Sequence, residues 1–472
     1  MPYHKVSHGQ IGFALFIMSL SIIILAAGQG TRMRSALPKV LHPLGGSPLL
    51  EHVIRTAREL NPGRIAVVYG HGGEQVREKL AEASVDWVLQ DKQLGTGHAV
   101  DQAMPSVNDD DTVLVLYGDV PLIQTGTLSA LVEKANAGQL AVLTAALDNP
   151  QGYGRMLRDD KGNLVGIVEQ KDASEEQLAI REINSGFLAA PAGRLRSWLQ
   201  RLDNSNAQGE YYLTDVIAMA AADGVAVESA GAAYEYEILG VNDRVQLAQL
   251  ERIWQRCQAE SLMRNGVTLA DPARLDIRGD VSAGTDCSID INVVLEGKVT
   301  LGERVSIGPG CVIKNATIGD DVEIFAHCVI EDGDIGSGCR IGPFARIRPE
   351  TKLAEQVHVG NFVEIKKSTV ARGSKINHLS YIGDTNMGSG VNIGAGTITC
   401  NYDGAYKHLT EIGNNVFVGS DTQLVAPVKV GDGATIGAGS TITSNVPENE
   451  LTLSRSRQQT VTGWKRPVKD KT

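Results

Sequence analysis

Branched apolar residues recur at every sixth position through the second half of the chain. The clearest runs are Leu295, Leu301, Ile307 and Ile313; Ile341, Ile347, Leu353, Val359 and Ile365; and Ile412, Val418, Leu424, Val430, Ile436 and Ile442. Each six-residue unit supplies one short strand and a turn, and three units make a coil whose branched side chains point to its axis. A β-sandwich would instead show a period of two. The sequence therefore predicts a parallel β-helix of hexapeptide repeats from residue 267 onward, with loops where the phase slips near residues 314–318 and 388–410.

Up to residue 240 the pattern is different, because apolar strand-like runs alternate with segments of helical spacing. The expected strands are Ile22–Leu25, Ile65–Tyr69, Trp87–Gln90, Val113–Tyr117, Leu140–Ala145 and Val165–Glu169, and the expected helices include Leu49–Leu60 and Gly126–Asn136. This alternation is typical of an α/β fold with a doubly wound, Rossmann-like parallel sheet. Ligands of such sheets bind at the carboxyl ends of the strands, which is where Gly28 and Asp119 fall.

A chain of 472 residues exceeds what one hydrophobic core usually covers, so we expect several domains. Residues 243–266 have roughly helical spacing and end at a glycine, which predicts a connecting helix. The expected parts are a spurious or disordered extension over residues 1–17, a first catalytic domain over 18–242, a linker helix over 243–266, and a β-helix with a basic tail over 267–472.

The apolar run over residues 11–27 has the character of a signal peptide or a short membrane span. It is slightly short for a span and leads without a break into a glycine-rich loop at Gly28, which cleavage near Ala26 and Ala27 would destroy. We therefore interpret Ser19–Leu25 as a buried strand of a parallel sheet and Met18 as the biological start, and we expect no membrane insertion.

The acidic balance of the chain restricts its partners. A net charge of -11 and a pI near 5.5 argue against sequence-independent nucleic-acid binding, which needs a basic surface. The cysteines form no CxxC pair and lack zinc-ligand spacing with histidines, so we expect free thiols, most of them stacked inside the β-helix, and a reducing cytoplasm. These cysteines are Cys257, Cys287, Cys311, Cys328, Cys339 and Cys400.

The segment from Leu25 to Met33, LAAGQGTRM, is followed by Lys39 and has the features of a phosphate-binding loop. Glycines let backbone amides approach a triphosphate, and the cations of Arg32 and Lys39 meet phosphate oxygens. Downstream, Gln90 and the string LGTG at 94–97 offer amide and backbone groups suited to the edge of a uracil. Asp119 ends an expected strand with a carboxylate, the hard oxygen ligand that magnesium prefers.

These motifs resemble a known family over nearly the whole chain from residue 18. The family comprises the bifunctional N-acetylglucosamine-1-phosphate uridyltransferases and glucosamine-1-phosphate N-acetyltransferases, which make UDP-N-acetylglucosamine for the peptidoglycan and lipopolysaccharide of the bacterial cell envelope. The strings that carry the resemblance, besides the loop, are GYGR at 152–155, IVEQKD at 167–172, EINSG at 182–186 and GVN at 240–242. Ser185 departs from the family motif, where threonine is commoner.

The resemblance implies a set of residues for the uridyltransferase site. UDP-N-acetylglucosamine would contact Leu25, Ala26, Ala27, Gly28, Lys39, Gln90, Gly95, Thr96, Tyr117, Gly118, Asp119, Gly154, Glu169, Asn184 and Asn242. Magnesium would be bound by Asp119 and Asn242. The sugar phosphate is already an anionic nucleophile, so its attack on UTP needs no protein base, and catalysis rests on alignment and charge neutralisation by magnesium, Lys39 and Arg32.

The spacing of the β-helix allows neighbours to be deduced. Arg348 and Lys366 are one full coil apart, which places their side chains on adjacent rungs about 4.8 Å apart. Such stacked cations repel each other, which makes sense if a phosphate lies between them, although an edge ladder that discourages aggregation is an equal alternative. By the same 18-residue step, Tyr402, Ser420 and Ala438 are expected to form one column of a groove.

The resemblance also implies the roles of residues in the acetyltransferase half. His378 would take a proton from the amine of glucosamine-1-phosphate as it attacks the thioester of acetyl-CoA, a role suited to an imidazole with its ordinary pKa near 6.5. The sugar phosphate would be bound by Arg348, Lys366, Tyr381 and Asn392. The acetyl-CoA path would be lined by Ala395, Asn401, Tyr402, Ser420, Ala438 and Arg455.

The family further implies a left-handed coil and a homotrimer with acetyl-transfer sites between subunits. Two alternatives remain at this point. The β-helix could be a regulatory module of a single-activity nucleotidyltransferase, or the chain could be a scaffold in which the β-helix only trimerises it. The Arg348 and Lys366 column with His378 argues against the first, and Lys39 with Asp119 argues against the second.

Overall fold

The computed structural model describes residues 19–28, 30–70 and 73–469 of the chain, so the expected extension over residues 1–17 lies outside the described residues. The chain divides into two compact units between Trp254 and Gln255. This division falls inside a helix, α8 (Arg244–Arg264), at the place where the sequence predicted a linker helix. Its first half therefore belongs to the first unit.

The first unit is built on a sheet with the strand order β11-β7-β10-β6-β1-β4-β5. The strands are β1 (Leu20–Leu25), β4 (Arg64–Gly70), β5 (Asp86–Gln90), β6 (Thr112–Tyr117), β7 (Leu140–Ala146), β8 (Arg155–Arg158), β9 (Leu164–Val168), β10 (Glu182–Pro191) and β11 (Val227–Gly231). A separate two-stranded ribbon consists of β2 (Pro43–Leu44) and β3 (Ser47–Pro48). Each strand expected from the sequence is present within two residues of its predicted bounds.

The predicted doubly wound sheet is present but is not parallel throughout, because β10 runs antiparallel to β6, β7 and β8, and β8 to β9. β10 follows the antiparallel pair β8 and β9, with only the short α5 (Glu175–Leu178) between them, and a chain without a long crossover returns in the opposite direction. The sheet is therefore mixed. The register of β10 with β7 shifts between Asn184 and Leu188, which produces an irregular bend beside the candidate site.

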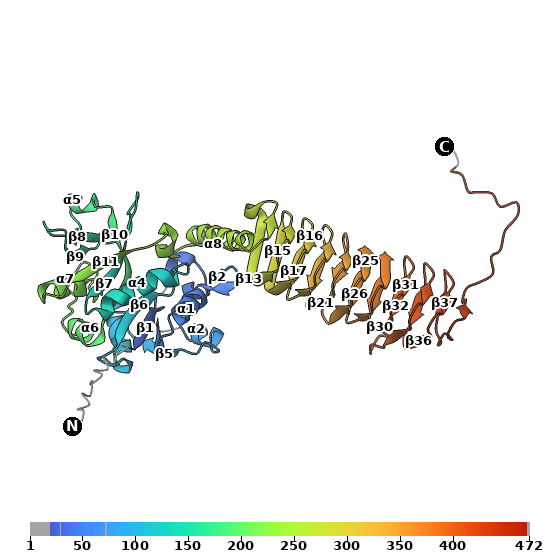
Figure 1. Cartoon of the computed structure of the whole chain (residues 1–472), viewed down its shortest axis with the longest axis horizontal. Helices are drawn as coiled ribbons and strands as arrows, with labels where there is room; N and C mark the ends of the chain where they lie inside the picture. The colour runs from blue at the N-terminus through green and yellow to red at the C-terminus, as the bar shows by residue number, and fades with distance from the viewer. Residues whose placement is uncertain (1–18, 29, 71–72, 470–472) are drawn as a thin grey trace, which may run out of the picture. The chain divides into compact units, whose positions relative to one another are not determined.

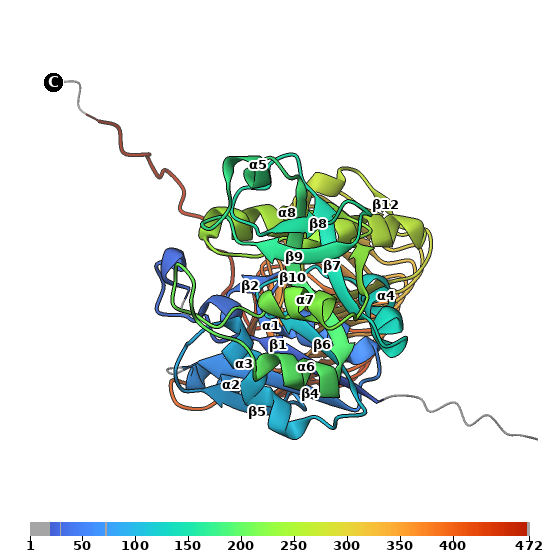
Figure 2. The ribbon, with the colours of Figure 1, turned by 90° about the vertical axis from the view of Figure 1, so that its left-hand side faces the viewer.

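Helices cover both faces of the sheet, and a separate apolar core lies between the sheet and the helices on each face (Figure 2). One face carries α1 (Leu49–Glu59), α2 (Glu74–Lys79) and α4 (Thr125–Asn136). The other carries α3 (Thr96–Ala103), α6 (Ala192–Leu199) and α7 (Asp215–Ala222). β1 is buried between the two layers, with Ile22, Ile23 and Ile24 completely inaccessible, as its continuous apolar sequence predicted.

The second unit is a parallel β-helix, whose coils appear as a stack of short arrows in Figure 1. One sheet comprises β12 (Thr268–Leu269), β14 (Ser288–Ile289), β16 (Ser306–Ile307), β19 (Glu323–Ile324), β22 (Arg340–Ile341), β25 (His358–Asn361), β28 (Lys375–His378), β31 (Asn392–Ile393), β34 (Phe417–Val418), β37 (Thr435–Ile436) and β39 (Leu451–Thr452). We call it the first sheet of the β-helix.

The remaining strands of the β-helix are joined in a second, larger sheet that includes the other faces of each coil. They are β13 (Leu275–Ala283), β15 (Val293–Leu301), β17 (Val312–Lys314), β18 (Thr317–Ile318), β20 (Val329–Glu331), β21 (Gly333–Ile335), β23 (Arg346–Ile347), β24 (Thr351–Leu353), β26 (Glu364–Lys366), β27 (Thr369–Val370), β29 (Tyr381–Gly383), β30 (Thr385–Met387), β32 (Ile398–Cys400), β33 (Thr410–Ile412), β35 (Gln423–Val425), β36 (Val428–Val430) and β38 (Thr441–Ile442).

The interior of the β-helix is filled as the six-residue period predicted. All residues of the three hexapeptide runs are buried, with at most 4% of any side chain exposed. Four of the cysteines, Cys287, Cys311, Cys328 and Cys339, are also buried there as free thiols that donate to backbone carbonyls. Cys400 is only half-buried, and Cys257 lies on α8.

Coil length in the β-helix varies, which decides which residues stack. Ile347 pairs with Ile365 across 18 residues, but Leu301 pairs with Ile318 across 17. The slip near residues 314–318 is therefore a corner shortened by one residue, and the prediction of a loop there was wrong. The predicted loop within 388–410 is present, because Asn392 pairs with Phe417 after 25 residues.

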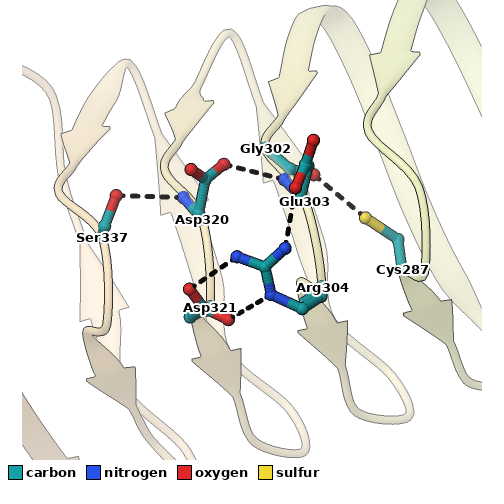
Figure 3. A network of polar contacts seen from close by, with 7 residues as sticks. All are labelled: Cys287, Gly302, Glu303, Arg304, Asp320, Asp321 and Ser337. Carbon is teal, nitrogen blue, oxygen red and sulfur yellow. Dashed lines mark hydrogen bonds and ion pairs between the residues drawn. The ribbon is translucent and has the colours of Figure 1, made fainter.

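Side chains at one corner of the β-helix bond successive coils together (Figure 3). The Asp320 carboxylate accepts a hydrogen bond from the Glu303 N–H at 2.8 Å, and the Ser337 hydroxyl accepts one from the Asp320 N–H at 3.1 Å. Arg304 donates to both carboxylate oxygens of Asp321 on the next coil. Equivalent bonds from a backbone N–H to an Asn or Asp side chain one coil later link Lys298 to Asn315, Ser389 to Asn414, and Asn414 to Asp432.

Candidate active sites

A cavity of about 290 Å³ opens at the carboxyl ends of β1 and β6. Its walls are Leu25, Ala26, Ala27, Gly28, Lys39, Val40, Gln90, Gln93, Gly95, Thr96, Ala99, Tyr117, Asp119 and Glu210. The loop after β1 can come close to a ligand, because a Cβ at Gly28 would meet open space. Gly30 is different: its φ is +61° and a Cβ would lie 2.6 Å from Lys39 Cβ, so glycine is required for Lys39 to lie against the loop.

Four predicted residues from distant parts of the chain meet beside this cavity. Lys39 forms an ion pair with Asp119 and lies 3.5 Å from Asn242 Oδ1. Arg32 donates to the same Asn242 Oδ1 at 2.8 Å. The Val241 N–H donates to the Asp119 carbonyl at 2.9 Å, which fixes the segment that carries Asn242 next to the end of β6.

The donor set fits the magnesium ion that the sequence predicted. Asp119 Oδ2 and Asn242 Oδ1 both approach the Lys39 ammonium, so a carboxylate and an amide oxygen converge on a cation there. Hard oxygen donors of this kind suit Mg²⁺. Among the described residues, no group of three His, Cys, Asp or Glu side chains could bind a metal. A magnesium ion at this position would take its other ligands from phosphate and water.

The residues predicted to bind the sugar lie close to one another near Tyr117. Gly186 has a φ of +94°, and a Cβ there would lie 2.6 Å from the Tyr117 ring. Next to it, the Asn184 N–H donates to the Gly154 carbonyl at 2.9 Å, and a Cβ at Gly154 would lie 3.4 Å from Glu169 Oε1. The irregular bend in β10 thus brings the three predicted sugar residues together on one side of Tyr117.

Burial and acidic neighbours dominate the electrostatics on this side. Burial, followed by the charges of Asp119 and Glu169, raises the pKa of Tyr117, so its phenol stays protonated. Burial, followed by the carboxylates of Asp172 and Asp215, raises the pKa of Glu169. Glu169 is thus a carboxyl group that accepts a proton more readily than usual.

At the opposite side of the cavity, Gln90 ends β5 and its Nε2 lies 3.1 Å from the Gly95 carbonyl and 3.0 Å from His98 Nδ1. Thr96 begins α3, and its hydroxyl accepts from the Leu213 N–H at 3.1 Å. Sequence reasoning missed four lining residues: Val40, Gln93, Ala99 and Glu210. Gln93 lies one residue before the LGTG string and donates to the Ala27 carbonyl, whereas nothing in the sequence marked Glu210.

In the β-helix, His378 is exposed at the end of β28. Its Nδ1 lies 3.0 Å from the Oδ1 of Asn361, which stands directly beneath it on β25. Sequence reasoning missed Asn361, although the spacing of 17 residues would have found it once the shortened coils were known. If Asn361 Oδ1 accepts the proton of Nδ1–H, Nε2 keeps its lone pair and faces outward as a base.

The predicted column of Tyr402, Ser420 and Ala438 was wrong. Ile393 pairs with Val418 and Val418 with Ile436, so Ala395, Ser420 and Ala438 stand in one line, and the Gly396 N–H donates to the His378 carbonyl below them. Tyr402 lies instead on a hairpin that bridges it to Lys407. The cause is the 25-residue coil between Asn392 and Phe417, which breaks the 18-residue step.

Arg348 and Lys366 do stand on adjacent coils, since Ile347 pairs with Ile365. Arg348 also forms a 2.7 Å ion pair with Glu364, which offsets part of the repulsion expected between the two stacked cations. Tyr381 is the next residue in the Glu364 line, on β29. Asn392 is not with them: it lies on β31 in the first sheet of the β-helix, whereas the other three lie in or beside strands of the second.

The remaining predicted residues border the hairpin and the tail. Asn401 is buried and donates to the carboxylate of Asp384. Tyr402 is 58% exposed, with the Lys407 ammonium 5.3 Å from its ring centroid. Arg455 donates to the Ala438 carbonyl at 2.6 Å, so the start of the basic tail lies at the end of the Ala395, Ser420 and Ala438 line.

Three family models match the chain. They are the MobA-like NTP transferase domain over residues 22–207, the GMPPB C-terminal domain over 277–361, and the bacterial transferase hexapeptide with six repeats over 409–444. A solved nucleotidyl transferase from Methanothermobacter thermautotroptrophicus covers 51% of this chain and 99% of its own, with 22% identity and a TM-score of 0.38. Within the described residues, α-helices long and apolar enough to cross a membrane are absent.

Curated relatives match both halves together. The protein named bifunctional protein GlmU of Alkalilimnicola ehrlichii is 59% identical over 95% of this chain and 97% of its own. The GlmU of Ralstonia nicotianae is 59% identical over 96% of this chain and 99% of its own. Because these matches run through the nucleotidyltransferase unit and the β-helix alike, the chain belongs to the GlmU family, the bifunctional enzymes of UDP-N-acetylglucosamine biosynthesis.

Proposed function

We propose that the two activities are divided between the two units. The first unit would transfer UMP from UTP to N-acetylglucosamine-1-phosphate with release of pyrophosphate. The second would first acetylate glucosamine-1-phosphate with acetyl-CoA. The observation that carries the first assignment is the meeting of Arg32, Lys39, Asp119 and Asn242 beside a cavity at the carboxyl ends of parallel strands.

In uridyl transfer, a phosphate oxygen of N-acetylglucosamine-1-phosphate attacks the α-phosphorus of UTP, and the bond to the bridging oxygen breaks as pyrophosphate leaves. Lys39 and Arg32 lie where they would neutralise the negative charge that builds up on the transferred phosphoryl group. When bound by Asp119 and Asn242, Mg²⁺ would supply further neutralisation. Gln90, Gly95 and Thr96 would hold uracil, while Gly154, Glu169 and Asn184 would hold the sugar.

In acetyl transfer, the amine of glucosamine-1-phosphate attacks the thioester carbon of acetyl-CoA, and the C–S bond breaks to release CoA thiolate. His378 Nε2 would take the proton that the amine loses and pass it to the thiolate. Asn361 supports this role, because an acceptor at Nδ1 holds the imidazole in the tautomer that leaves Nε2 free. Arg348, Lys366, Tyr381 and Asn392 would bind the sugar phosphate.

The line of small residues at Ala395, Ser420 and Ala438 would leave a groove for the pantetheine arm of acetyl-CoA. This line starts directly above His378, which places the groove beside the base. Asn401 and Tyr402 would border the acetyl end, and Arg455 would meet the phosphates of CoA. A solvated tail remains the simpler role for the other basic residues near the C-terminus.

The acetyl-transfer site is proposed to form between subunits of a homotrimer. Asn392 stands on a different sheet from Arg348, Lys366 and Tyr381, so one chain offers the predicted sugar-phosphate residues on separate faces. The β-helix also exposes a ladder of apolar side chains at one corner, in which Phe344 stacks on His327 at 5.2 Å and on Phe362 at 5.3 Å. Such an exposed apolar ladder is suited to self-association.

A cytoplasmic location is proposed as well. All six cysteines lie within the described residues as free thiols, and four of them are buried in the β-helix. This usage suits a reducing compartment, where UTP and acetyl-CoA are also available to the enzyme as substrates.

The division of labour is tested by one pair of substitutions. Asp119→Ala should reduce pyrophosphate release at least about 100-fold, because charge stabilisation at the transferred phosphoryl group is lost, and leave acetyl transfer near normal. His378→Ala should reduce acetyl transfer about 100-fold or more and leave pyrophosphate release near normal. Both rates are measured on the same preparations, by pyrophosphate release and by thiol release from acetyl-CoA. A folded single variant that loses both activities would contradict the proposal.

A further inference from the structure

The start of α8 contacts Asn242, one of the two residues proposed to bind magnesium. Asn242 lies two residues before the first residue of α8, and its backbone N–H donates to Gln246 Oε1 at 2.8 Å. Asp243 caps the helix, since its carboxylate accepts from the Val245 and Gln246 N–H groups at 2.9 Å each. The cap fixes the backbone of Gln246, and the Gln246 amide in turn fixes the backbone of Asn242.

The side-chain oxygen of Asn242 takes part in the candidate site. Asn242 Oδ1 accepts from Arg32 at 2.8 Å and lies 3.5 Å from Lys39 Nζ. A rotation of the Asn242 backbone would move this oxygen away from both cations. The Gln246 amide oxygen accepts the hydrogen bond of the Asn242 N–H and so restrains the backbone that sets where the Asn242 oxygen points.

The helix itself is firmly attached to the first unit. Leu250 is buried in one small cluster with Met33, the neighbour of Arg32, and with Val241, the neighbour of Asn242. Further along, Glu251 accepts from the Gly45 N–H at 2.7 Å. The Trp254 ring covers Gly45 so closely that a Cβ there would lie 2.6 Å from it.

From this arrangement we infer that Gln246 is a positioning residue for uridyl transfer, and that it acts by holding Asn242 in the orientation that binds the divalent cation. The inference rests on the proposed role of Asn242. The first three turns of α8 would then take part in uridyl transfer, and the helix as a whole also joins the two units. Residues that orient a metal ligand typically change metal affinity or activity by about 10- to 100-fold when replaced.

The test uses the full-length enzyme with Gln246→Met, which keeps the length of the side chain and removes the acceptor. Binding of Mn²⁺ in the presence of UTP is measured by electron paramagnetic resonance, and pyrophosphate release is measured against Mg²⁺ concentration. We expect Gln246→Met to weaken Mn²⁺ binding and to raise the Mg²⁺ requirement about 10-fold. Acetyl transfer by the same preparation should be unchanged, because the second unit carries it, and an unchanged thermal unfolding curve shows that the first unit is folded.

Two matched variants make the result specific. Gln246→Glu retains an acceptor oxygen at the same position and should restore Mn²⁺ binding to near the level of the unmodified enzyme. Gln249→Ala changes an exposed glutamine on the same helix and should have no effect. If Gln246→Met binds Mn²⁺ as well as Gln249→Ala does, while Asn242→Ala binds it poorly, the inference is wrong and the proposed site stands. If Asn242→Ala binds Mn²⁺ normally, the proposed magnesium site itself fails.

Discussion

The two units assemble their candidate sites in opposite ways. In the first unit, Arg32 bonds to Asn242 across 210 residues and Lys39 to Asp119 across 80, because strands and loops converge at one edge of a sheet. In the β-helix, His378 stands above Asn361 simply because one coil separates them. The contacts of the first site therefore depend on how the loops meet at the edge of the sheet. The contact between His378 and Asn361 depends instead on the number of residues in the coil that separates them.

Subunit mixing gives the sharpest test of how the second site is completed. Lys366→Ala and Arg455→Ala should each reduce acetyl transfer strongly, because each removes a cation proposed to meet an anionic group of a substrate. If the two residues serve one site from different chains, subunit exchange between the variants should restore activity at about a quarter of the sites. Thiol release before and after exchange measures this. The absence of any recovery, or a fully active monomer by light scattering, would contradict the intersubunit site.

The long coil offers a test of the dependence on spacing. Deleting residues 402–408 would shorten the 25-residue coil to the ordinary length and remove the hairpin that carries Tyr402. The coils on either side should keep their pairing, so circular dichroism should change little.

Acetyl transfer by this deletion variant should nevertheless fall about 100-fold, as expected when groups that align a substrate are lost. Pyrophosphate release serves as the control and should be unaffected, because the first unit does not contain the coil. An active deletion variant would show that the hairpin has no part in the site.

A smaller effect is expected from Glu169 in the first unit. Burial and the acidic neighbours raise its pKa, so the folded state binds its proton more tightly than the unfolded state does. Stability from this group is therefore present below its unfolded pKa and is lost as the pH rises through the folded pKa.

Glu169→Gln should accordingly raise the melting temperature at pH 7 to 8 relative to the unmodified enzyme, and the difference should vanish in acid. The same variant should bind the sugar nucleotide less well if Glu169 contacts the sugar. Thermal unfolding of the first unit at several pH values measures the first effect. A destabilised variant at pH 8 would show that a hydrogen bond of the carboxylate outweighs its burial.

The fold could be predicted from the sequence because both of its patterns are local. The six-residue period of Ile347, Leu353 and Val359 and the apolar run of β1 need no knowledge of distant contacts, and both predictions were confirmed. The antiparallel β10 escaped prediction, since strand direction depends on the connection and leaves little trace within the strand.

The candidate sites were predictable to different degrees for the same reason. The loop from Leu25 to Lys39 carries its chemistry in one segment, whereas Glu210 and Gln246 reach their places through tertiary contacts. In the β-helix, counting placed Lys366 correctly above Arg348. It misplaced Tyr402, because a 25-residue coil interrupts the series, and it missed Asn361, because the coil before His378 has 17 residues.

The corner bonds of the β-helix have a direction along the chain. The N–H of Glu303 is satisfied by Asp320 and that of Asp320 by Ser337, so each donor waits for an acceptor that lies further toward the C-terminus. During synthesis on the ribosome, every new coil would therefore complete the one made before it, and until then the earlier donors remain bonded to water. The bonds of this corner would thus form one after another, in the order in which the coils are translated.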